Sequence, residues 1–288
     1  MKEFLEWSIG RLNQAGVDSP RMEAEVLFSG ALRVGREEIF LRPERVLTEP
    51  EKNTLRSFVE RRVLREPVAY ILRTKEFWSL DFTITPDVLI PRPETEVLVE
   101  TLLSQNLKKP SELSFRLLDI GTGSGVIAVV AAQEIHNCQV TATDYFPSVL
   151  AVAKLNSERH GVSDRVHFVK SNVFSHLSKA LYDCIVSNPP YIKTSNLNDL
   201  VPDVINFEPC SALDGGSDGL GFYKQIIPKA LNYLKKGGFI ILEIGETQAN
   251  AVTSLFHSTG YYEKINVVQD YSGYDRVVFA RKKTNAYG

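Results

Sequence analysis

The stretch 188–191, Asn-Pro-Pro-Tyr, combines residue types that suit the positioning of a planar amino group. The side-chain oxygen of Asn188 and the backbone carbonyl of Pro189 can each accept one N–H, which would leave the nitrogen aimed in one direction. Pro190 stiffens the loop, and the ring of Tyr191 can pack flat against a planar group. We therefore predict that these four residues bind and orient an NH2 group and are catalytic.

Methyl transfer is the chemistry that such positioning serves. The lone pair of an amide or ring nitrogen is delocalised, so the nitrogen must be held in line with the methyl group that it attacks. Two carbonyl dipoles would ease the positive charge that develops on the nitrogen, and no strong general base is required. The alternative is a rigid loop at a strand exit, which the two prolines would explain by themselves. The presence of a cofactor-type turn earlier in the chain favours the catalytic interpretation.

That turn is the stretch 119–125, with the pattern D-x-G-x-G-x-G. Glycines at the end of a strand let the backbone come close to a ligand. The dinucleotide fingerprint starting at Gly121 would need glycine at position 126, where the chain has Val126. An acid before the glycines would repel a pyrophosphate and suits a cationic ligand, such as the amino group and sulfonium of S-adenosylmethionine. The predicted cofactor contacts in this turn are Asp119, Gly121, Thr122, Gly123, Ser124 and Gly125.

Further cofactor contacts are predicted at the ends of the following strands. Asp144 ends the stretch T-A-T-D, where a carboxylate can accept both ribose hydroxyls. Asn172 follows the next strand, at a place from which an adenine edge could be read, and Asn188 ends the fourth strand. The alternative is that Asp144 only caps the helix that contains Val149 to Leu155 and that the glycines only form a tight turn. That alternative does not explain Asp119.

The elements that must position these residues are indicated from residue 116 onward, where strands and helices alternate. Such alternation predicts a largely parallel sheet with helices on both faces. The last two strands follow each other without a helix, so we expect the sheet to end in an antiparallel pair. We expect strands at 116–120, 139–144, 165–171, 182–188, 239–245, 262–270 and 275–282, and helices at 90–106, 125–135, 147–161, 221–234 and 248–258.

The part of the chain before residue 91 has a different pattern. Residues 1–72 carry helical periodicity and predict a small helical bundle, with helix starts at Ser19-Pro20 and at Thr48-Glu49-Pro50-Glu51. Residues 73–90 predict a β-hairpin linker. The apolar positions of the helices are Leu5, Ile9, Leu12, Ala24, Leu27, Phe28, Ala31, Leu55, Phe58, Val59 and Val63.

The composition is that of an ordinary soluble globular protein, with 288 residues, 43% of them hydrophobic and 24% charged. A net charge of -2 offers no global positive field for a nucleic-acid backbone, which weakens a DNA or RNA substrate without excluding it. The 3 cysteines form no C-x-x-C pair and the 5 histidines show no ligand spacing, so no metal is expected. The absence of a signal-peptide pattern and of an apolar run of ~18 residues predicts a cytoplasmic location.

With these residues in view, the chain resembles the HemK/PrmC family of protein-glutamine N5-methyltransferases, which act on peptide chain release factors. The resemblance covers nearly the whole length. "IPRPETE" together with "NPPYI" is more specific than N-P-P-Y alone, which also occurs in DNA adenine methyltransferases. The other stretches that carry the resemblance are "REPVAYI", "EFWSLDF", "LLDIGTGSGVIAV", "FEPCSAL", "GSDGLGFYKQI", "LKKGGFIILEIG" and "GYDRVV".

The resemblance implies a class I S-adenosylmethionine-dependent methyltransferase fold, which is Rossmann-like with a mostly parallel sheet and an antiparallel final strand. It also implies that domain 1–72 docks the release factor, that 73–90 is a hairpin linker, and that 91–288 methylates the glutamine of a Gly-Gly-Gln loop. S-adenosylhomocysteine would be the product, and we expect a monomer with no membrane or direct nucleic-acid partner. By position, Gly121 to Gly125, Asp144, Val173 and Asn188 resemble cofactor contacts, and 188–191 resembles the glutamine clamp.

Two departures from the family pattern concern the site and the linker. Asn172-Val173 stands where the family often has Asp-Trp, which removes an aromatic wall near the adenine and predicts weaker cofactor affinity than in relatives with Trp. Phe174 could supply an aromatic surface in its place. Arg73 stands where the family tends to have Gly, which leaves the conformation of the linker turn undetermined at the level of sequence.

Several assignments stay open at the level of sequence. Glu208 is either a carboxylate that anchors its loop or a substrate-binding residue, and "PRPETE" is either a helix start or part of the floor of the active site. The alternative function within enzymes is a methyltransferase for an exocyclic amine of nucleic acid, adenine N6 or guanine N2. A non-catalytic module that holds a ribosomal partner is the alternative outside enzymes, and the intact 188–191 stretch argues against it.

Overall fold

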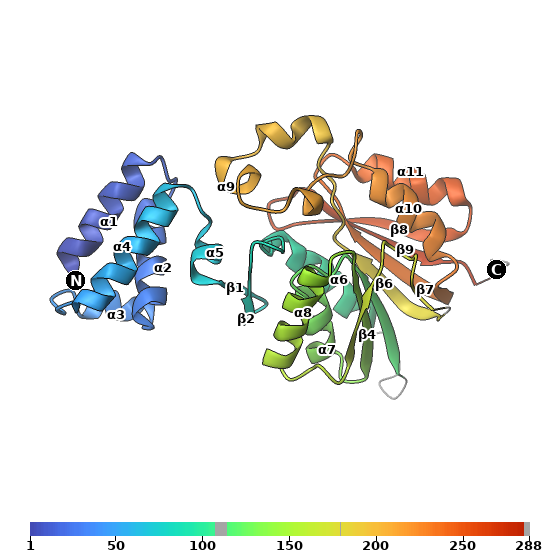
Figure 1. Cartoon of the computed structure of the whole chain (residues 1–288). Helices are drawn as coiled ribbons and strands as arrows, with labels where there is room; N and C mark the ends of the chain where they lie inside the picture. Colours follow the sequence, from blue (N-terminus) through green and yellow to red (C-terminus); the bar gives the residue numbers. More distant parts are fainter. Residues whose placement is uncertain (107–113, 179, 285–288) are drawn as a thin grey trace. The chain divides into compact units, whose positions relative to one another are not determined.

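The computed structural model describes residues 1–106, 114–178 and 180–284, which fall into two compact units (Figure 1). The first unit comprises Met1–Thr74, Ile84–Pro86 and Leu200–Glu208. The second comprises Lys75–Thr83, Asp87–Asp199 and Pro209–Gly288. The segment Leu200–Glu208, which belongs to the first unit although it lies late in the chain, is not part of the predicted helical domain 1–72.

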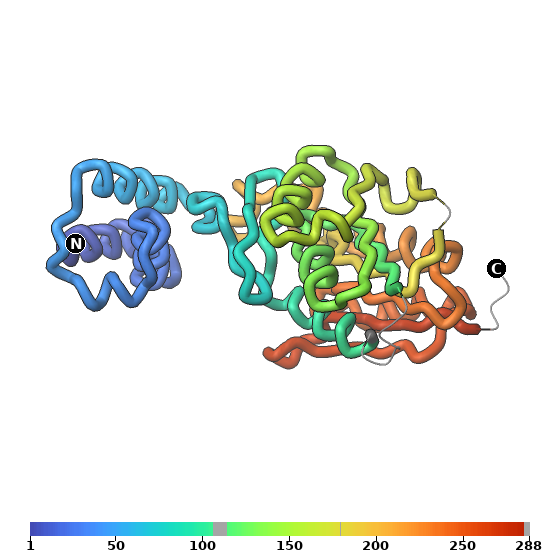
Figure 2. The backbone as a smooth tube through the Cα atoms, turned by 90° about the horizontal axis from the view of Figure 1, so that it is seen from below, coloured from blue at the N-terminus to red at the C-terminus, as the bar shows by residue number. Residues whose placement is uncertain are grey.

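The first unit is helical, as the periodicity of residues 1–72 predicts. Within it, α1, α2 and α4 pack side by side (Figure 2). The predicted start of α4 is confirmed by a capping box, in which the Thr48 hydroxyl accepts the N–H of Glu51 and the Glu51 carboxylate accepts the N–H of Thr48. The helices are α1 Lys2–Gln14, α2 Pro20–Leu32, α3 Arg36–Leu41, α4 Glu49–Val63, α5 Val68–Leu72 and α9 Pro202–Ile205.

Apolar side chains and one buried cation hold the first unit together. The predicted apolar positions of α1, α2 and α4 pack into a single core around Leu12, Phe28 and Leu55. Beside this core, Arg62 is buried and forms ion pairs with both Glu23 and Asp203. Asp203 lies on α9, so the segment Leu200–Glu208 is tied to the helical bundle by charge pairing.

A β-hairpin follows α5, as predicted, with strands β1 Thr74–Phe77 and β2 Leu80–Thr83. Arg73, where the family tends to have Gly, is the C-cap of α5 and has a left-handed backbone with φ 57°. Because L-residues with a side chain are strained there, glycine would suit this position better than arginine does. Trp78 and Ser79 at the hairpin turn also have positive φ, and the indole N–H of Trp78 donates to Glu134.

The second unit contains a seven-stranded sheet with the order β5-β4-β3-β6-β7-β9-β8. The strands from β5 to β7 are parallel, whereas β9 pairs antiparallel with both β7 and β8. The predicted class I methyltransferase fold, including its antiparallel final strand, is confirmed. The strands are β3 Phe115–Ile120, β4 Cys138–Asp144, β5 Val166–Lys170, β6 Tyr182–Ser187, β7 Leu234–Glu243, β8 Tyr262–Gln269 and β9 Asp275–Lys282.

Helices cover both faces of this sheet. On one face, α10 and α11 pack over a core that includes Leu118, Ile185 and Ile240, while α6, α7 and α8 cover the other face (Figure 1). Because both faces are covered, all six residues of β6 are buried. The helices are α6 Glu96–Asn106, α7 Val126–Glu134, α8 Pro147–Arg159, α10 Gly221–Ala230 and α11 Ala249–Thr259, with 3-10 turns η1 Pro93–Thr95, η2 Thr194–Asp199 and η3 Cys210–Ala212.

One predicted helix is too long. The sequence indicates a helix over 221–234, but α10 ends at Ala230 and Leu234 already pairs with Tyr182 as the first residue of β7. The amino group of Lys282 donates to the carbonyls of Leu231 and Leu234, which stabilises this exit from the helix.

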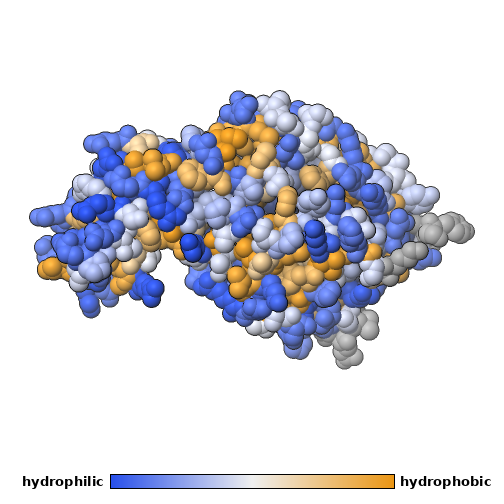
Figure 3. Space-filling view, viewed as in Figure 1, coloured by the Kyte–Doolittle hydropathy of each residue, from blue (hydrophilic) through white to orange (hydrophobic). Residues whose placement is uncertain are grey.

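The surface is mixed in character. On the face shown in Figure 3, polar residues cover most of the surface and apolar residues form separate patches. Within the ranges that the structure describes, no helix is both long enough and apolar enough to cross a membrane.

Candidate active site

A cavity of about 350 Å³ opens at the carboxyl ends of β3, β4 and β6 in the second unit. Its volume lies within the range of ~300–1,000 Å³ that is usual for small-molecule sites. Ligands of open parallel sheets bind at this edge. Of the predicted site residues, those that line the cavity are Gly121, Thr122, Gly123, Ser124, Asp144, Asn172, Val173, Asn188, Pro189 and Pro190.

The glycine turn forms one wall of the cavity. Gly121 and Gly123 have φ of 72° and 57°, and a Cβ atom added to either would meet no atom within 4 Å. The left-handed backbone and the open space beside it are what a close approach of backbone to a ligand requires. Gly125 does not line the cavity; a Cβ there would come within 3.1 Å of Ala153, so this glycine allows α7 and α8 to pack.

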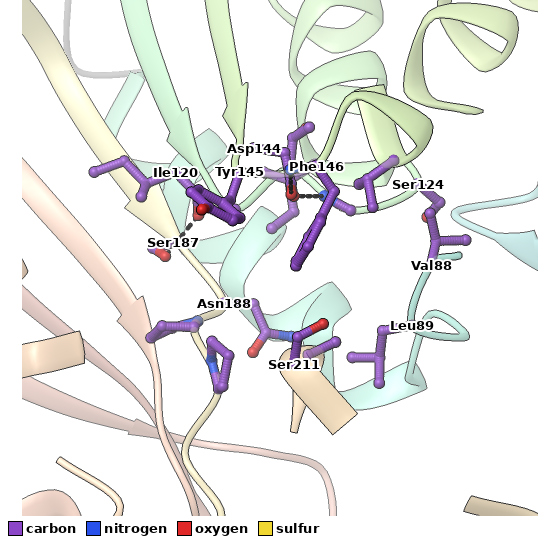
Figure 4. A pocket seen from close by; sticks show the side chains of 18 of the residues that line it. Val88, Leu89, Ile120, Ser124, Asp144, Tyr145, Phe146, Ser187, Asn188 and Ser211 are labelled. Carbon is purple, nitrogen blue, oxygen red and sulfur yellow. Dashed lines mark hydrogen bonds between the residues drawn. The ribbon is translucent and has the colours of Figure 1, made fainter. Parts of the chain in front are cut away.

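Asp144 joins the glycine turn to the end of β4. Its Oδ2 accepts the N–H of Gly123 at 3.2 Å, and its Oδ1 accepts the N–H of Phe146 at 3.2 Å (Figure 4). The N-cap of α8 is Phe146, with no side-chain capping bond, so the structure does not support the helix-cap alternative for Asp144. Burial raises the pKa of Asp144, opposed by these bonds from the backbone.

Asp119 differs from its predicted place as a contact with a cationic ligand. The side chain is fully buried and does not line the cavity. Its Oδ2 accepts the hydroxyl of Thr122 at 2.6 Å, and Thr122 does line the cavity. Burial raises the pKa of Asp119 to about 7, opposed by that hydrogen bond. The carboxylate therefore supports the turn from beneath instead of facing the cavity.

The turn after β5 lines the cavity with Asn172, which is exposed, and with Val173. Val173 has φ 54°, a strained conformation for a β-branched residue. Phe174 does not replace the aromatic wall that the family pattern has here. It packs in the core and stacks on Tyr233, with ring centroids 4.7 Å apart.

Asn188 faces the glycine turn across the cavity, and its side chain lies opposite Asp144 and Phe146 (Figure 4). It follows β6, whose last residue Ser187 donates its hydroxyl to the carbonyl of Ile120 at 2.7 Å and so ties two strand ends together. The amide nitrogen of Asn188 donates to the hydroxyl of Thr95 at 3.2 Å.

Two predicted substrate-binding residues do not line the cavity. Tyr191 packs against the core beside Gly245, and the Gln248 side chain donates to its carbonyl at 3.0 Å. Burial raises the pKa of Tyr191 to about 12, so the phenol stays neutral. Glu208 is buried, and its backbone N–H donates to the carbonyl of Val204 at 2.9 Å. Both alternatives for its carboxylate stay predictions.

Several residues that line the cavity were not predicted. Tyr145 and Phe146 directly follow Asp144 and form an exposed edge-to-face pair, with centroids 5.0 Å apart. Two apolar aromatics after the acid at a strand end are the signal that could have indicated them.

The motif "IPRPETE" contributes to the cavity and also starts a helical segment. Pro91, Arg92 and Thr95 line the cavity, and Pro93–Thr95 forms the first helical turn, so both interpretations of that motif hold.

Comparison with known proteins identifies relatives over nearly the whole chain. The model of the PrmC N-terminal domain matches residues 3–72, and that of the methyltransferase small domain matches residues 94–207. The release factor glutamine methyltransferase of Geobacter sulfurreducens is 43% identical, over 98% of this chain and 96% of that protein. The proteins of the same name from Coxiella burnetii and Moorella thermoacetica are 41% and 39% identical, covering 92% and 98% of this chain and 92% and 99% of their own length.

Solved structures agree in fold. A methyltransferase from Pyrococcus furiosus superposes with a TM-score of 0.53 at 22% identity, over 73% of this chain and 91% of that one. The catalytic domain of hMettl16, solved with the MAT2A 3'UTR hairpin 6, gives 0.55 at 19% identity, over 83% of each chain. At this identity, the likeness concerns the fold alone.

Proposed function

Because the chain belongs to the family of release factor glutamine methyltransferases, we propose that it methylates the side-chain amide nitrogen of a glutamine in a peptide chain release factor. The observation that carries the proposal is Asn188, which lies across one cavity from a glycine turn and Asp144. In this arrangement an amide-binding side chain and a cofactor cradle share a single space.

The residues present fit S-adenosylmethionine. The open backbone of Gly121 and Gly123 allows close approach, and Asp144 offers carboxylate lone pairs to a ribose diol. The exposed rings of Tyr145 and Phe146 offer apolar surface for a base. When bound, S-adenosylmethionine supplies a methyl group carried on a positively charged sulfur.

The chain's own contribution is positioning. We assign to Asn188 Oδ1 and to the Pro189 carbonyl the two N–H bonds of the glutamine amide, so that the nitrogen faces the cofactor side of the cavity. Both oxygens also stabilise the positive charge that develops on the nitrogen as it gains a methyl group. The nitrogen then loses one proton to solvent. Pro190 limits the motion of the loop that carries both acceptors.

Recognition of the protein substrate is assigned to the helical first unit. Its match to the PrmC N-terminal domain model supports this assignment, as do the exposed apolar side chains Phe40, Leu41 and Val46. A release factor substrate also supports the predicted cytoplasmic location. Monomeric state and the absence of nucleic-acid binding stay predictions.

The test is incubation of the purified protein with S-adenosylmethionine and a recombinant release factor, followed by peptide mass spectrometry of the Gly-Gly-Gln peptide. We expect a mass increase of one methyl group on the glutamine. Asn188→Ala should abolish it, whereas Asn232→Ala, at an exposed position between α10 and β7, should not. Methyl transfer to DNA or RNA instead of the release factor would support the nucleic-acid alternative, and transfer to neither would refute the proposed activity.

A further inference from the structure

A polar array joins Asn188 to the buried end of the sheet. It consists of Asn188, Thr95 on η1 and Glu243 at the end of β7. Thr95 and Glu243 are 3% and 1% exposed. Asn188 and Thr95 line the cavity, whereas Glu243 does not. The array therefore reaches from the buried sheet end to the cavity wall.

The chemistry of the three groups assigns the direction of each hydrogen bond. An ionised carboxylate only accepts, and hydrogen bonds from Thr95 and from Asn188 act to lower the pKa of Glu243. Thr95 has one hydroxyl proton, so if it donates that proton to Glu243, its oxygen is available to accept the amide N–H of Asn188, at 3.2 Å. The nitrogen of Asn188 is thus held toward Thr95 and Glu243, which leaves Oδ1 as the atom that can accept a hydrogen bond from a substrate.

The opposite orientation of the Asn188 amide would be unfavourable. Oδ1 would then face the carboxylate of Glu243 and compete with it for the single hydroxyl proton of Thr95. It would also present NH2 to the cavity, and an NH2 group cannot accept the N–H of a substrate amide. The hydrogen bonds of the array therefore favour one orientation of the Asn188 amide, although both orientations fill the same space.

Burial of the Glu243 carboxylate is energetically unfavourable, which indicates a role beyond packing. Its Oε2 has no hydrogen-bond partner among the described residues. Burial raises the pKa of Glu243 to about 7, Arg276 opposes this and Glu94 adds to it. The negative charge of Glu243 in turn raises the pKa of Tyr191 and Tyr223, after burial, and the hydroxyl of Tyr223 donates to the backbone carbonyl of Glu243 at 2.8 Å. An apolar residue would cost less here, since neighbouring positions of β7 are apolar and buried.

We infer that Thr95 and Glu243 are positioning residues that set the amide orientation of Asn188, so that Oδ1 faces the substrate as an acceptor. The inference rests on the proposed function, because it explains how the glutamine clamp obtains its direction. It makes the site selective for substrates that offer an N–H at this point.

The experiment compares Thr95→Val, which removes the hydroxyl at equal size, with Thr95→Ser, which keeps it. Thr101→Val is the matched control, because Thr101 is also buried and its hydroxyl donates to the carbonyl of Val97 on its own helix. Three quantities are measured: kcat and KM of methyl transfer, the affinity for S-adenosylhomocysteine by calorimetry, and the 15N–1H signals of the Asn188 side-chain amide.

We expect Thr95→Val to lower kcat about 10- to 100-fold, as misorientation of a substrate-positioning group does. The affinity for S-adenosylhomocysteine should stay unchanged, and the Asn188 amide signals should shift. Thr95→Ser should restore both kcat and the signals, and Thr101→Val should match the wild type. An unchanged kcat with unchanged Asn188 signals in Thr95→Val would overturn the inference.

Glu243→Gln provides a second variant in case Thr95→Val does not fold. The neutral amide removes a buried charge, so we expect a higher urea midpoint at pH 8 together with a lower kcat. A gain in stability with full kcat would contradict the inference. If the wild type methylates no release factor, the proposed function fails, while the Asn188 signals in Thr95→Val and Thr95→Ser still test the array.

Discussion

Replacing Asp144 by Asn tests the cofactor cradle at a single group. Each carboxylate oxygen accepts one backbone N–H, from Gly123 and from Phe146, both at 3.2 Å. Asn has the same size but only one acceptor oxygen, so its NH2 must face one of these two N–H groups. The change removes one brace of the glycine turn and also the charged acceptor that we assign to the ribose hydroxyls.

The magnitude follows from the second loss, because the missing brace of the glycine turn affects the free and the bound protein alike. A hydrogen bond to a charged group contributes about 1.5–3 kcal/mol, and the carboxylate can accept two of them from the ribose diol. Asp144 is only half-buried, so the lower part of that range applies to each of these bonds. A total of about 3 kcal/mol corresponds to roughly 100-fold weaker binding, since about 1.4 kcal/mol is a factor of ten.

Calorimetry with S-adenosylhomocysteine at pH 8 measures the effect. Asp164→Asn, an exposed carboxylate in the same unit, is the control and should bind like the wild type. Because burial raises the pKa of Asp144, the affinity of the wild type should also fall as the pH is lowered through that pKa. Asp144→Asn should lack this pH dependence. A dissociation constant within about threefold of the wild type, with an unchanged circular dichroism spectrum, would refute the reasoning.

Three further predictions concern stability in urea denaturation. Arg62→Met should destabilise the first unit by about 1–3 kcal/mol, because it leaves Glu23 without its buried cation and leaves Asp203 paired with Arg65 alone; an unchanged midpoint would contradict this. Arg73→Gly should stabilise by about 0.5–1 kcal/mol, since the relief of left-handed strain exceeds the added entropy of the unfolded glycine; a lower midpoint would show that the side chain matters. Asp119 binds its proton more tightly in the folded protein, with a pKa of about 7, so its contribution to stability is largest below pH 4 and declines as the pH rises to about 7. The difference in the free energy of unfolding between Asp119→Asn and the wild type should therefore favour the variant more at pH 8 than at pH 4. An equal difference at both pH values would count against a raised pKa.

Local patterns in the sequence predict much of this architecture. Strand and helix periods depend on neighbouring residues, so the alternation after residue 116 and the helices of residues 1–72 are visible without a structure. The carboxyl ends of parallel strands meet at one edge, and for that reason Gly121, Asp144 and Asn188 could be assigned to one rim.

Other features depend on contacts between distant parts of the chain. Asp119 lies beneath the turn and Tyr191 packs into the core, because the space beside each strand end is divided by neighbours that no local pattern specifies. The pairing of Arg62 with Asp203 joins residues 141 positions apart. Charge complementarity of that kind has no period along the sequence.

The array of Asn188, Thr95 and Glu243 shows most clearly what the sequence and the tertiary structure each determine. The motif "NPPY" indicates an amide-binding residue, because its chemistry belongs to four consecutive side chains. The direction of that amide depends on Thr95 and Glu243, which are 93 and 55 positions away in the chain and meet only when β6 and β7 pair. Residue types thus determine which groups can bind a substrate, and the folded sheet decides which atom of Asn188 faces it, because burial and hydrogen bonding act between groups that only tertiary packing brings together.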